Sequence, residues 1–102
     1  MARKEFETLT PQMYYILLVL KQPRHGYDIM KEIARITNER VQVGAGTLYA
    51  LMPRFIEDGY IRLVSEEDRK KIYQLTPYGE RKLEEENEKM KHMLKCWEEM
   101  QR

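Results

Sequence analysis

The sequence predicts a single domain that is mainly α-helical and carries one small β-hairpin. Three features of the 102-residue chain lead to this fold class. Apolar residues recur at helical spacing in three segments before residue 60, β-rich segments follow directly after Gly59, and a helical pattern returns at Pro77. A chain of this length holds one core and buries only about two-thirds of its unfolded surface, which favours association with a partner subunit.

The first helix is expected to begin at Pro11, directly behind Thr10. A threonine hydroxyl can cap the free N–H groups of a first turn, and proline is tolerated at the first helical position because its missing N–H would have no helical partner there. The apolar stripe that follows is wide, so this helix is expected to be covered on more than one side. Residues 22–26 contain Pro23 and Gly26 and are expected to end it.

The second and third helices are both predicted from apolar residues on one face. The second is expected over residues 27–37, with Asn38 as its C-terminal stop. The third is expected to begin at Thr47, a cap residue behind the flexible residues 44–46, and to end at Gly59. The two apolar faces consist of Ile29, Met30, Ile33 and Ile36, and of Leu48, Leu51, Met52, Phe55 and Ile56.

Pro53 lies inside the predicted third helix. Proline there removes a backbone hydrogen bond and clashes with the carbonyl group four residues earlier. Either the helix kinks near residues 50–53, or it begins later than Thr47. The direction in which its outward side chains point depends on this choice.

The period of the sequence changes after Gly59. Residues 60–64 and 70–75 are rich in β-formers, and the polar residues 65–69 between them predict a hairpin with a charged tip. Thr76 and Pro77 repeat the cap-plus-proline signal and are expected to begin a last helix. Three helices, a hairpin and a helix in this order describe a winged helix-turn-helix domain over residues 1–76, followed by a dimerisation helix over residues 77–102.

The last helix carries a heptad pattern. Five residues follow one another at spacings of 4, 3, 4 and 3, namely Leu83, Asn87, Met90, Leu94 and Trp97. A helix that extends beyond so small a domain must cover this stripe, and a second copy of the chain is the simplest partner. Asn87 either fixes the register of that dimer from within the seam or lies at its exposed rim.

Composition excludes several classes of protein. With 18 basic and 17 acidic residues, any contact with nucleic acid must come from a local patch. The single cysteine excludes a disulfide framework, the first residues lack the apolar region of a signal peptide, and no apolar run is long enough to span a membrane, so we expect a cytoplasmic protein without a membrane partner.

The residue pattern also argues against catalysis and metal binding. Residues 44–46 are too short for a phosphate-binding loop and lack a preceding strand, and no Ser/His/Asp or Cys/His arrangement is visible. His92 and Cys96 share a helix face, but two ligands do not make a structural zinc site. We therefore expect no enzyme activity, no cofactor and no metal site.

Three segments resemble the PadR-like family of transcriptional regulators. Residues 25–29 (HGYDI) resemble the opening of that family's second helix, and residues 46–49 with Arg54 and residues 58–61 resemble its recognition-helix signature. Residues 69–76 with Gly79 resemble its wing and the start of its last helix. The resemblance covers residues 9–83 and implies a homodimeric DNA-binding regulator, usually a repressor. It further implies that the third helix enters the major groove, the wing contacts the backbone or minor groove, and the last helix forms the dimer.

The candidate DNA-contacting residues lie near the expected interface. They carry a hydroxyl or a positive charge, except for one glycine at the start of the third helix. Phosphate neutralisation by Lys and Arg supplies much of the binding free energy, and glycines let a helix N-terminus approach the duplex. The candidates are Tyr27, Arg40, Gly46, Thr47, Tyr49, Arg54, Arg69, Lys70, Lys71 and Tyr73.

Several candidates have an alternative structural role. Thr47 could serve only as an N-cap, and Tyr49 could pack on the second helix. Tyr73 either faces inward with Leu75 or reaches a backbone phosphate. The three cations at 69–71 either contact phosphate or form a solvated turn next to the acidic residues 66–68.

Trp97 allows a further expectation. The family resemblance implies that a planar aromatic compound can bind between paired tryptophans of the last helices. Met93, Trp97 and Met100 could form such a surface, whereas the alternative is that Trp97 only packs the dimer.

Our leading hypothesis is a homodimeric repressor that binds a double-stranded DNA operator, with release by a small aromatic effector as an additional hypothesis. The alternative is a winged-helix protein-interaction or dimerisation module without DNA binding, which the near-zero net charge favours.

Overall fold

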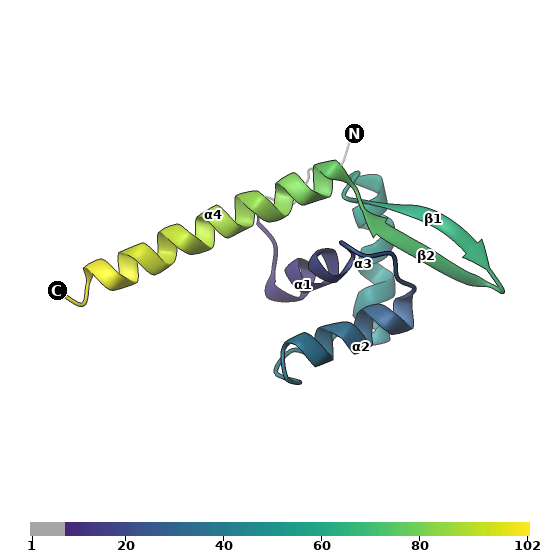
Figure 1. Ribbon diagram of the computed structural model, residues 1–102, viewed down its shortest axis with the longest axis horizontal. Coiled ribbons are helices and arrows are strands. Elements are labelled where there is room, and N and C mark those ends of the chain that lie inside the picture. The colour runs from purple at the N-terminus through teal and green to yellow at the C-terminus, as the bar shows by residue number, and fades with distance from the viewer. Residues whose placement is uncertain (1–7) are drawn as a thin grey trace.

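The computed structural model describes residues 8–102 as a three-helix body with a hairpin and a long last helix (Figure 1). The hairpin extends from one side of the body and the last helix from the opposite side. This arrangement confirms the predicted fold class, while residues 1–7 of the predicted domain lie outside the described part. The elements are α1 (Pro11–Val19), α2 (Gly26–Ile36), α3 (Ala45–Glu57), β1 (Ile61–Glu67), β2 (Lys70–Leu75) and α4 (Pro77–Glu99).

The predicted start of α1 is confirmed. Thr10 is its N-cap, and the threonine hydroxyl accepts a hydrogen bond from the backbone N–H of Met13 at 3.2 Å. Ile16, Leu17 and Val19 are buried, and the neighbouring residues of the stripe are half-buried, so α1 is covered on more than one side as expected.

The C-terminal end of α2 lies close to the predicted stop. The helix ends at Ile36, and the Thr37 hydroxyl donates a hydrogen bond to the Ile33 carbonyl oxygen at 2.8 Å. Asn38 and Glu39 then adopt positive φ angles of 52° and 62°, which turn the chain toward α3. Asparagine is one of the few residues that tolerates this region well.

The predicted start of α3 is wrong by one turn. Its N-cap is Gly44 in extended conformation, so Thr47 is the third residue of the helix and not its cap. The Gly44 carbonyl accepts the first helical hydrogen bond, from Leu48 N–H at 3.0 Å. A glycine cap carries no side-chain hydrogen bond, and the threonine signal was therefore misleading.

Pro53 lies inside α3, and the helix continues through it to Glu57. The later start considered from the sequence is excluded, because α3 begins at Ala45. Pro53 is exposed, and Leu48, Met52 and Phe55 form the buried face. Solvent can therefore satisfy the Tyr49 carbonyl that lacks a helical donor.

The core lies where α1, α2 and α3 meet the base of the hairpin. Its fully buried side chains include Ile16, Leu17, Ile29, Leu48 and Phe55. Tyr60 is fully buried at the end of α3 and stacks on Tyr78 of α4, with ring centroids 5.5 Å apart.

The hairpin formed by β1 and β2, called the wing below, is longer than predicted. Glu67 pairs with Lys70, so only Asp68 and Arg69 form the turn, and residues 65–67 belong to β1. The register shifts between Leu63 and Ser65, as in a β-bulge, which increases the local twist of a hairpin. The predicted five-residue tip is thus corrected to a two-residue turn.

The base of the wing is joined to the body by backbone hydrogen bonds. Tyr73 exchanges two with Arg24, at 2.9 and 3.0 Å, and Leu75 N–H donates to the Leu20 carbonyl oxygen at 2.8 Å. The segment between α1 and α2 therefore lies beside β2 and holds the wing against the start of α2.

The first turns of α4 pack on the body. Thr76 is the predicted N-cap: its hydroxyl accepts from Gly79 N–H at 3.0 Å and donates to the Gly59 carbonyl oxygen at 2.6 Å. Gly79 and Leu83 are buried, whereas every residue from 88 to 99, called distal α4 below, is exposed. Distal α4 projects away from the body (Figure 1). Within residues 8–102, no helix combines the length and apolar character that a membrane crossing requires.

Candidate nucleic-acid interface

A recess of about 420 Å³ lies between the start of α2, the first half of α3 and the wing. It brings together six of the ten predicted DNA-contacting residues, which come from three separate segments of the chain. Three are tyrosines and three are cations. Its lining consists of His25, Gly26, Tyr27, Tyr49, Arg69, Lys70, Lys71 and Tyr73.

The N-terminus of α3 is open beside this recess. A Cβ atom added at Gly44 or Gly46 would have no neighbour within 4 Å, and Thr47 is exposed on the first turn. The N–H groups of a first helical turn carry partial positive charge and bind anions. With Thr47 excluded as the cap, its hydroxyl is left on the surface of the turn that the resemblance places nearest to DNA.

Tyr49 contacts α2 and also remains more than half exposed. A Cβ atom at Gly26 would overlap the Tyr49 hydroxyl and lie 2.8 Å from its Cζ atom. Glycine at position 26 therefore allows the phenol to lie directly against the first residue of α2. The two roles considered for Tyr49 are compatible, because one edge of the ring packs and the rest stays accessible.

The start of α2 carries no side-chain cap. His25 occupies the N-cap position in extended conformation, and its Nε2 atom lies 3.2 Å from the Asp28 carboxylate. The first residues of α2 line the recess, and no N-cap side chain satisfies the backbone N–H groups of this turn. Tyr27 is exposed beside them, with the Lys31 ammonium 5.3 Å from its ring centroid.

The cations of the wing lie on its tip and second strand. Arg69 is in the turn, and Lys70 and Lys71 begin β2, opposite Glu67 and Glu66. All three cations are exposed and line the recess. Cross-strand acids lower the potential at the tip, but the side chains of the cations extend toward the start of α2.

Tyr73 is buried, so of the two alternatives considered for it the structure has the inward orientation, shared with Leu75. Its side chain nevertheless lines the recess. The alternatives of packing and phosphate contact are therefore not exclusive for this residue.

Four predicted contacts lie off the recess. Gly46 and Thr47 lie on the open first turn of α3, and Arg40 is exposed in the loop before it. Arg54 is half-buried further along α3 and already interacts with other groups of the chain.

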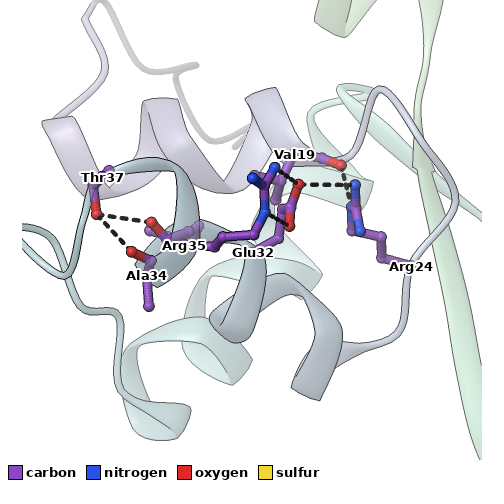
Figure 2. Close-up of polar contacts among 7 residues, drawn as sticks. Val19, Arg24, Glu32, Ala34, Arg35 and Thr37 are labelled. Atoms are coloured by element: carbon purple, nitrogen blue, oxygen red, sulfur yellow. Dashed lines mark hydrogen bonds and ion pairs between the residues drawn. The ribbon is translucent and has the colours of Figure 1, made fainter.

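Arg24 has a structural role, shown in Figure 2. Its Nε atom donates to the Val19 carbonyl oxygen at 2.8 Å, and its Nη2 atom lies 3.5 Å from the Glu32 carboxylate. Arg35 binds the same carboxylate through two hydrogen bonds of 2.8 Å. Hydrogen bonding from Arg35 lowers the pKa of Glu32, with a smaller contribution from Arg24. This cluster ties the end of α1 to α2 and so fixes the helix that begins at the recess.

The residues of the predicted dimer seam fall into two groups. Leu83 is only 4% exposed within the subunit's own core, and Asn87 is half-buried and accepts a hydrogen bond from the Tyr14 hydroxyl. The distal residues are exposed, as are the predicted ligand-binding residues: Met90, Met93, Leu94, Trp97 and Met100.

His25 and Gly26 line the recess but are not among the residues predicted to contact DNA. Gly26 lies in the HGYDI segment, which pointed to the start of the second helix. The role of Gly26 in the recess depends on its contact with Tyr49, 23 positions later in the chain. No local pattern contains that contact.

Solved structures with the same architecture are known. A transcriptional regulator from Clostridium thermocellum superposes with a TM-score of 0.75 and 28% sequence identity, covering 84% of this chain and 88% of that chain. F93 from STIV, described as a winged-helix DNA-binding protein, superposes with a TM-score of 0.69 and 28% identity, covering 78% of this chain and 87% of that chain.

The three-helix body, wing and last helix define this chain as a winged-helix protein. Its residues 16–85 match the transcriptional regulator PadR-like family. The chain belongs to that family, whose members are transcriptional regulators. An uncharacterised protein X of Lysinibacillus sphaericus is 32% identical over 87 residues, covering 81% of this chain and 73% of that protein.

Proposed function

We propose that this chain is a cytoplasmic, homodimeric repressor that binds duplex DNA. The N-terminus of α3 enters the major groove and the wing lies on the phosphate backbone. The observation that carries this proposal is the cationic, tyrosine-lined recess beside the open first turn of α3. The winged-helix DNA-binding protein F93 and the family membership support the same assignment.

The charge of the chain makes this a local interface. The formal net charge is +1, so there is no general attraction to DNA. Binding depends on cations that displace counterions from phosphates, and these are gathered at residues 69–71. A dimer presents two such wings, one to each half of a pseudo-palindromic operator.

Distal α4 supplies the proposed dimer contact. Leu83 and Asn87 are used mainly within the subunit, so the seam between subunits runs over Met90, Leu94 and Trp97. The division into a DNA-binding part (residues 1–76) and a dimerisation part (residues 77–102) is kept as part of the proposal, with the intersubunit contact concentrated in distal α4.

The exposed surface of Met93, Trp97 and Met100 supports an effector site within this dimer. Trp97 is 63% exposed in the single subunit, and methionines one turn away on either side add polarisable surface. A small planar aromatic compound held there would change the spacing of the two subunits and release the operator. Quenching of fluorescence from the only tryptophan tests this directly.

A salt titration of DNA binding tests the main proposal. A dimer with about six to ten phosphate contacts loses roughly three to five decades of affinity between 50 and 200 mM salt. Replacement of Arg69, Lys70 and Lys71 together by alanine should weaken binding to all duplexes by a similar factor. A monomer in solution, or affinity that does not change with salt, contradicts the proposal.

A protein-interaction module without DNA binding is the second candidate. The acidic partners of the wing lysines, Glu66 and Glu67, and the low net charge favour it. The same titration separates the two, because such a module forms a dimer but shows no salt-dependent binding to its own upstream DNA.

A further inference from the structure

Tyr73 is the buried polar residue of the recess. Its side chain is 91% buried on the inner face of β2 and lines the recess. Both backbone polar groups are held by Arg24, but within residues 8–102 no hydrogen bond of its phenol hydroxyl is found. The hydroxyl oxygen is not among the buried side-chain atoms that lack a partner, so on this largely buried residue it is the polar group open to the recess. A group that enters the recess can therefore hydrogen-bond to it.

The neighbouring groups of the recess define the chemistry of that partner. The uncapped N–H groups of α2 favour an anion, and the cations at residues 69–71 give the site a positive potential. The Tyr49 hydroxyl lies against Gly26, at the same helix start. These donors converge from three elements, and hydroxyl and N–H donors together suit an oxygen anion such as a phosphate.

We propose that the recess seats one phosphodiester group of the DNA backbone, which accepts hydrogen bonds from the Tyr73 hydroxyl and from the first turn of α2. This rests on the proposed DNA-binding function and goes beyond it by assigning a phosphate-binding role to the base of the wing. Tyr49 closes the site on the α3 side, and the wing cations supply charge. The seated phosphate fixes how deeply α3 enters the groove.

Gly26 sets the size of the site. Its backbone conformation is one that any residue can adopt, and only the end of the Tyr49 side chain prevents a Cβ atom there. A Gly26→Ala chain therefore folds with the Tyr49 ring displaced and the recess narrowed. This variant removes the site without removing charge.

The test measures DNA binding by fluorescence anisotropy for wild type, Tyr73→Phe and Gly26→Ala. Tyr15→Phe is the matched control, because Tyr15 is a half-buried tyrosine on α1 that does not line the recess. Tyr73→Phe should weaken binding to specific and unrelated duplexes alike by about tenfold, as expected for a hydrogen bond to a charged group. Its salt slope should stay unchanged because no charge is lost, whereas Lys71→Ala should reduce the slope by about one.

A phosphate scan locates the contact. Single phosphates of the operator are replaced in turn by neutral methylphosphonates. In wild type, neutralising the phosphate that the recess binds should lower DNA affinity, at one position in each half-site. In Tyr73→Phe the loss of affinity at that position should be smaller, and the losses at all other positions should equal those of wild type. An identical scan for wild type and Tyr73→Phe overturns the proposal.

Further outcomes separate the possible failures. If Tyr73→Phe binds as tightly as Tyr15→Phe while wild type binds with a steep salt slope, the phosphate site is wrong and the proposed function stands. If wild type does not bind DNA, the proposed function fails as well. If inorganic phosphate alone raises the melting temperature of wild type but not of Tyr73→Phe, and the scan is unaltered, the recess serves a free anion and the DNA assignment is overturned.

Discussion

Arg69 occupies a backbone conformation that favours glycine. Asp68 and Arg69 have φ angles of 50° and 67°, as in the two-residue turns that join the strands of a β-hairpin. A left-handed conformation costs an L-residue about 1–2 kcal/mol, whereas an asparagine or glycine at this place is common. The phosphate contact proposed for Arg69 would account for an arginine at this place.

Replacing Arg69 by glycine should therefore change stability and DNA binding in opposite directions. The free energy of unfolding should rise by roughly 0.5 kcal/mol, since glycine relieves the left-handed strain but has more freedom in the unfolded chain. DNA affinity should fall, and the salt slope should decrease by about one. Urea unfolding and salt-dependent anisotropy measure the two effects. Arg69→Asn is the control, since asparagine also tolerates this region; lower stability in both variants contradicts the interpretation.

Glu32 gives a pH-dependent prediction at the same scale. Hydrogen bonding from Arg35 lowers the pKa of Glu32 in the folded chain, so its contribution to stability is present above the ordinary glutamate pKa and is lost as the pH falls through the lowered value. Glu32→Gln should therefore be less stable than wild type at pH 7, and the difference should shrink below about pH 4.

Urea unfolding at pH 7 and pH 3 checks this behaviour of Glu32. Glu88→Gln is the control, because Glu88 is an exposed carboxylate on α4 with one lysine partner at 3.3 Å. It should not differ measurably from wild type at either pH. An undiminished effect of Glu32→Gln at pH 3 contradicts an ionic origin.

The chemistry of the candidate site could be predicted residue by residue, but its assembly could not. The wing cations and Tyr49 were identified from their types and from the resemblance. The contact of Tyr49 with Gly26 joins two helices, and the convergence of Tyr73 with the start of α2 depends on backbone pairing with Arg24. Such contacts are set by packing at long sequence separation, which no local pattern encodes.

At the level of elements, prediction succeeded where a side chain marks the boundary. Thr10 and Thr76 cap α1 and α4 through their hydroxyls, and both starts were found. It failed at α3, where the cap is a glycine without a side-chain hydrogen bond. The length of the wing was also underestimated, because the polar residues 65–67 are paired in a strand whose faces are both exposed.

Two glycines at helix starts should respond oppositely to alanine. A Cβ atom at Gly79 would overlap the Tyr60 carbonyl oxygen and lie 2.7 Å from Leu75 Cδ1, so α4 would have to move from the wing base. Gly79→Ala should lower the free energy of unfolding by about 2 kcal/mol. A Cβ atom at Gly46 would have no neighbour within 4 Å. Gly46→Ala should therefore raise the free energy of unfolding by about 0.5–1 kcal/mol, and the added methyl group should weaken DNA binding.

Thermal unfolding measures both glycine variants. For a domain of this size, each kcal/mol corresponds to a shift of roughly 4–8 °C in Tm. Equal shifts for the two variants would show that the contact between α4 and the wing base does not restrain the helix.

The whole molecule is elongated, with principal extents of 57, 38 and 22 Å. Much of the length comes from α4, whose first turns pack on the body and whose distal part projects from it (Figure 1). Within the subunit, Glu86 is buried and accepts hydrogen bonds from the Thr8 hydroxyl and Leu9 N–H, both at 3.2 Å. The base of α4 is therefore held against the segment that precedes α1, and in the proposed dimer this contact would couple the arrangement of the two copies to the two DNA-binding surfaces.

In the proposed dimer, DNA affinity should therefore depend on distal α4, although it lies far from the wing. Leu94 is 58% exposed in the subunit, so Leu94→Glu should leave the fold intact and place a charge in the proposed seam between copies. The variant should be a folded monomer, with a salt slope of DNA binding about half that of wild type because each protein then contacts one half-site. Light scattering after gel filtration and salt-dependent anisotropy measure the two quantities together.

His92→Glu is the matched control for this prediction. It adds a negative charge two residues away, at a position that the heptad pattern directs outward from the seam. It should remain dimeric and bind DNA as wild type does, because its side chain does not enter the contact between helices. If Leu94→Glu also stays dimeric with a full salt slope, the two copies associate through another surface, and the spacing of the two wings is set elsewhere than in distal α4.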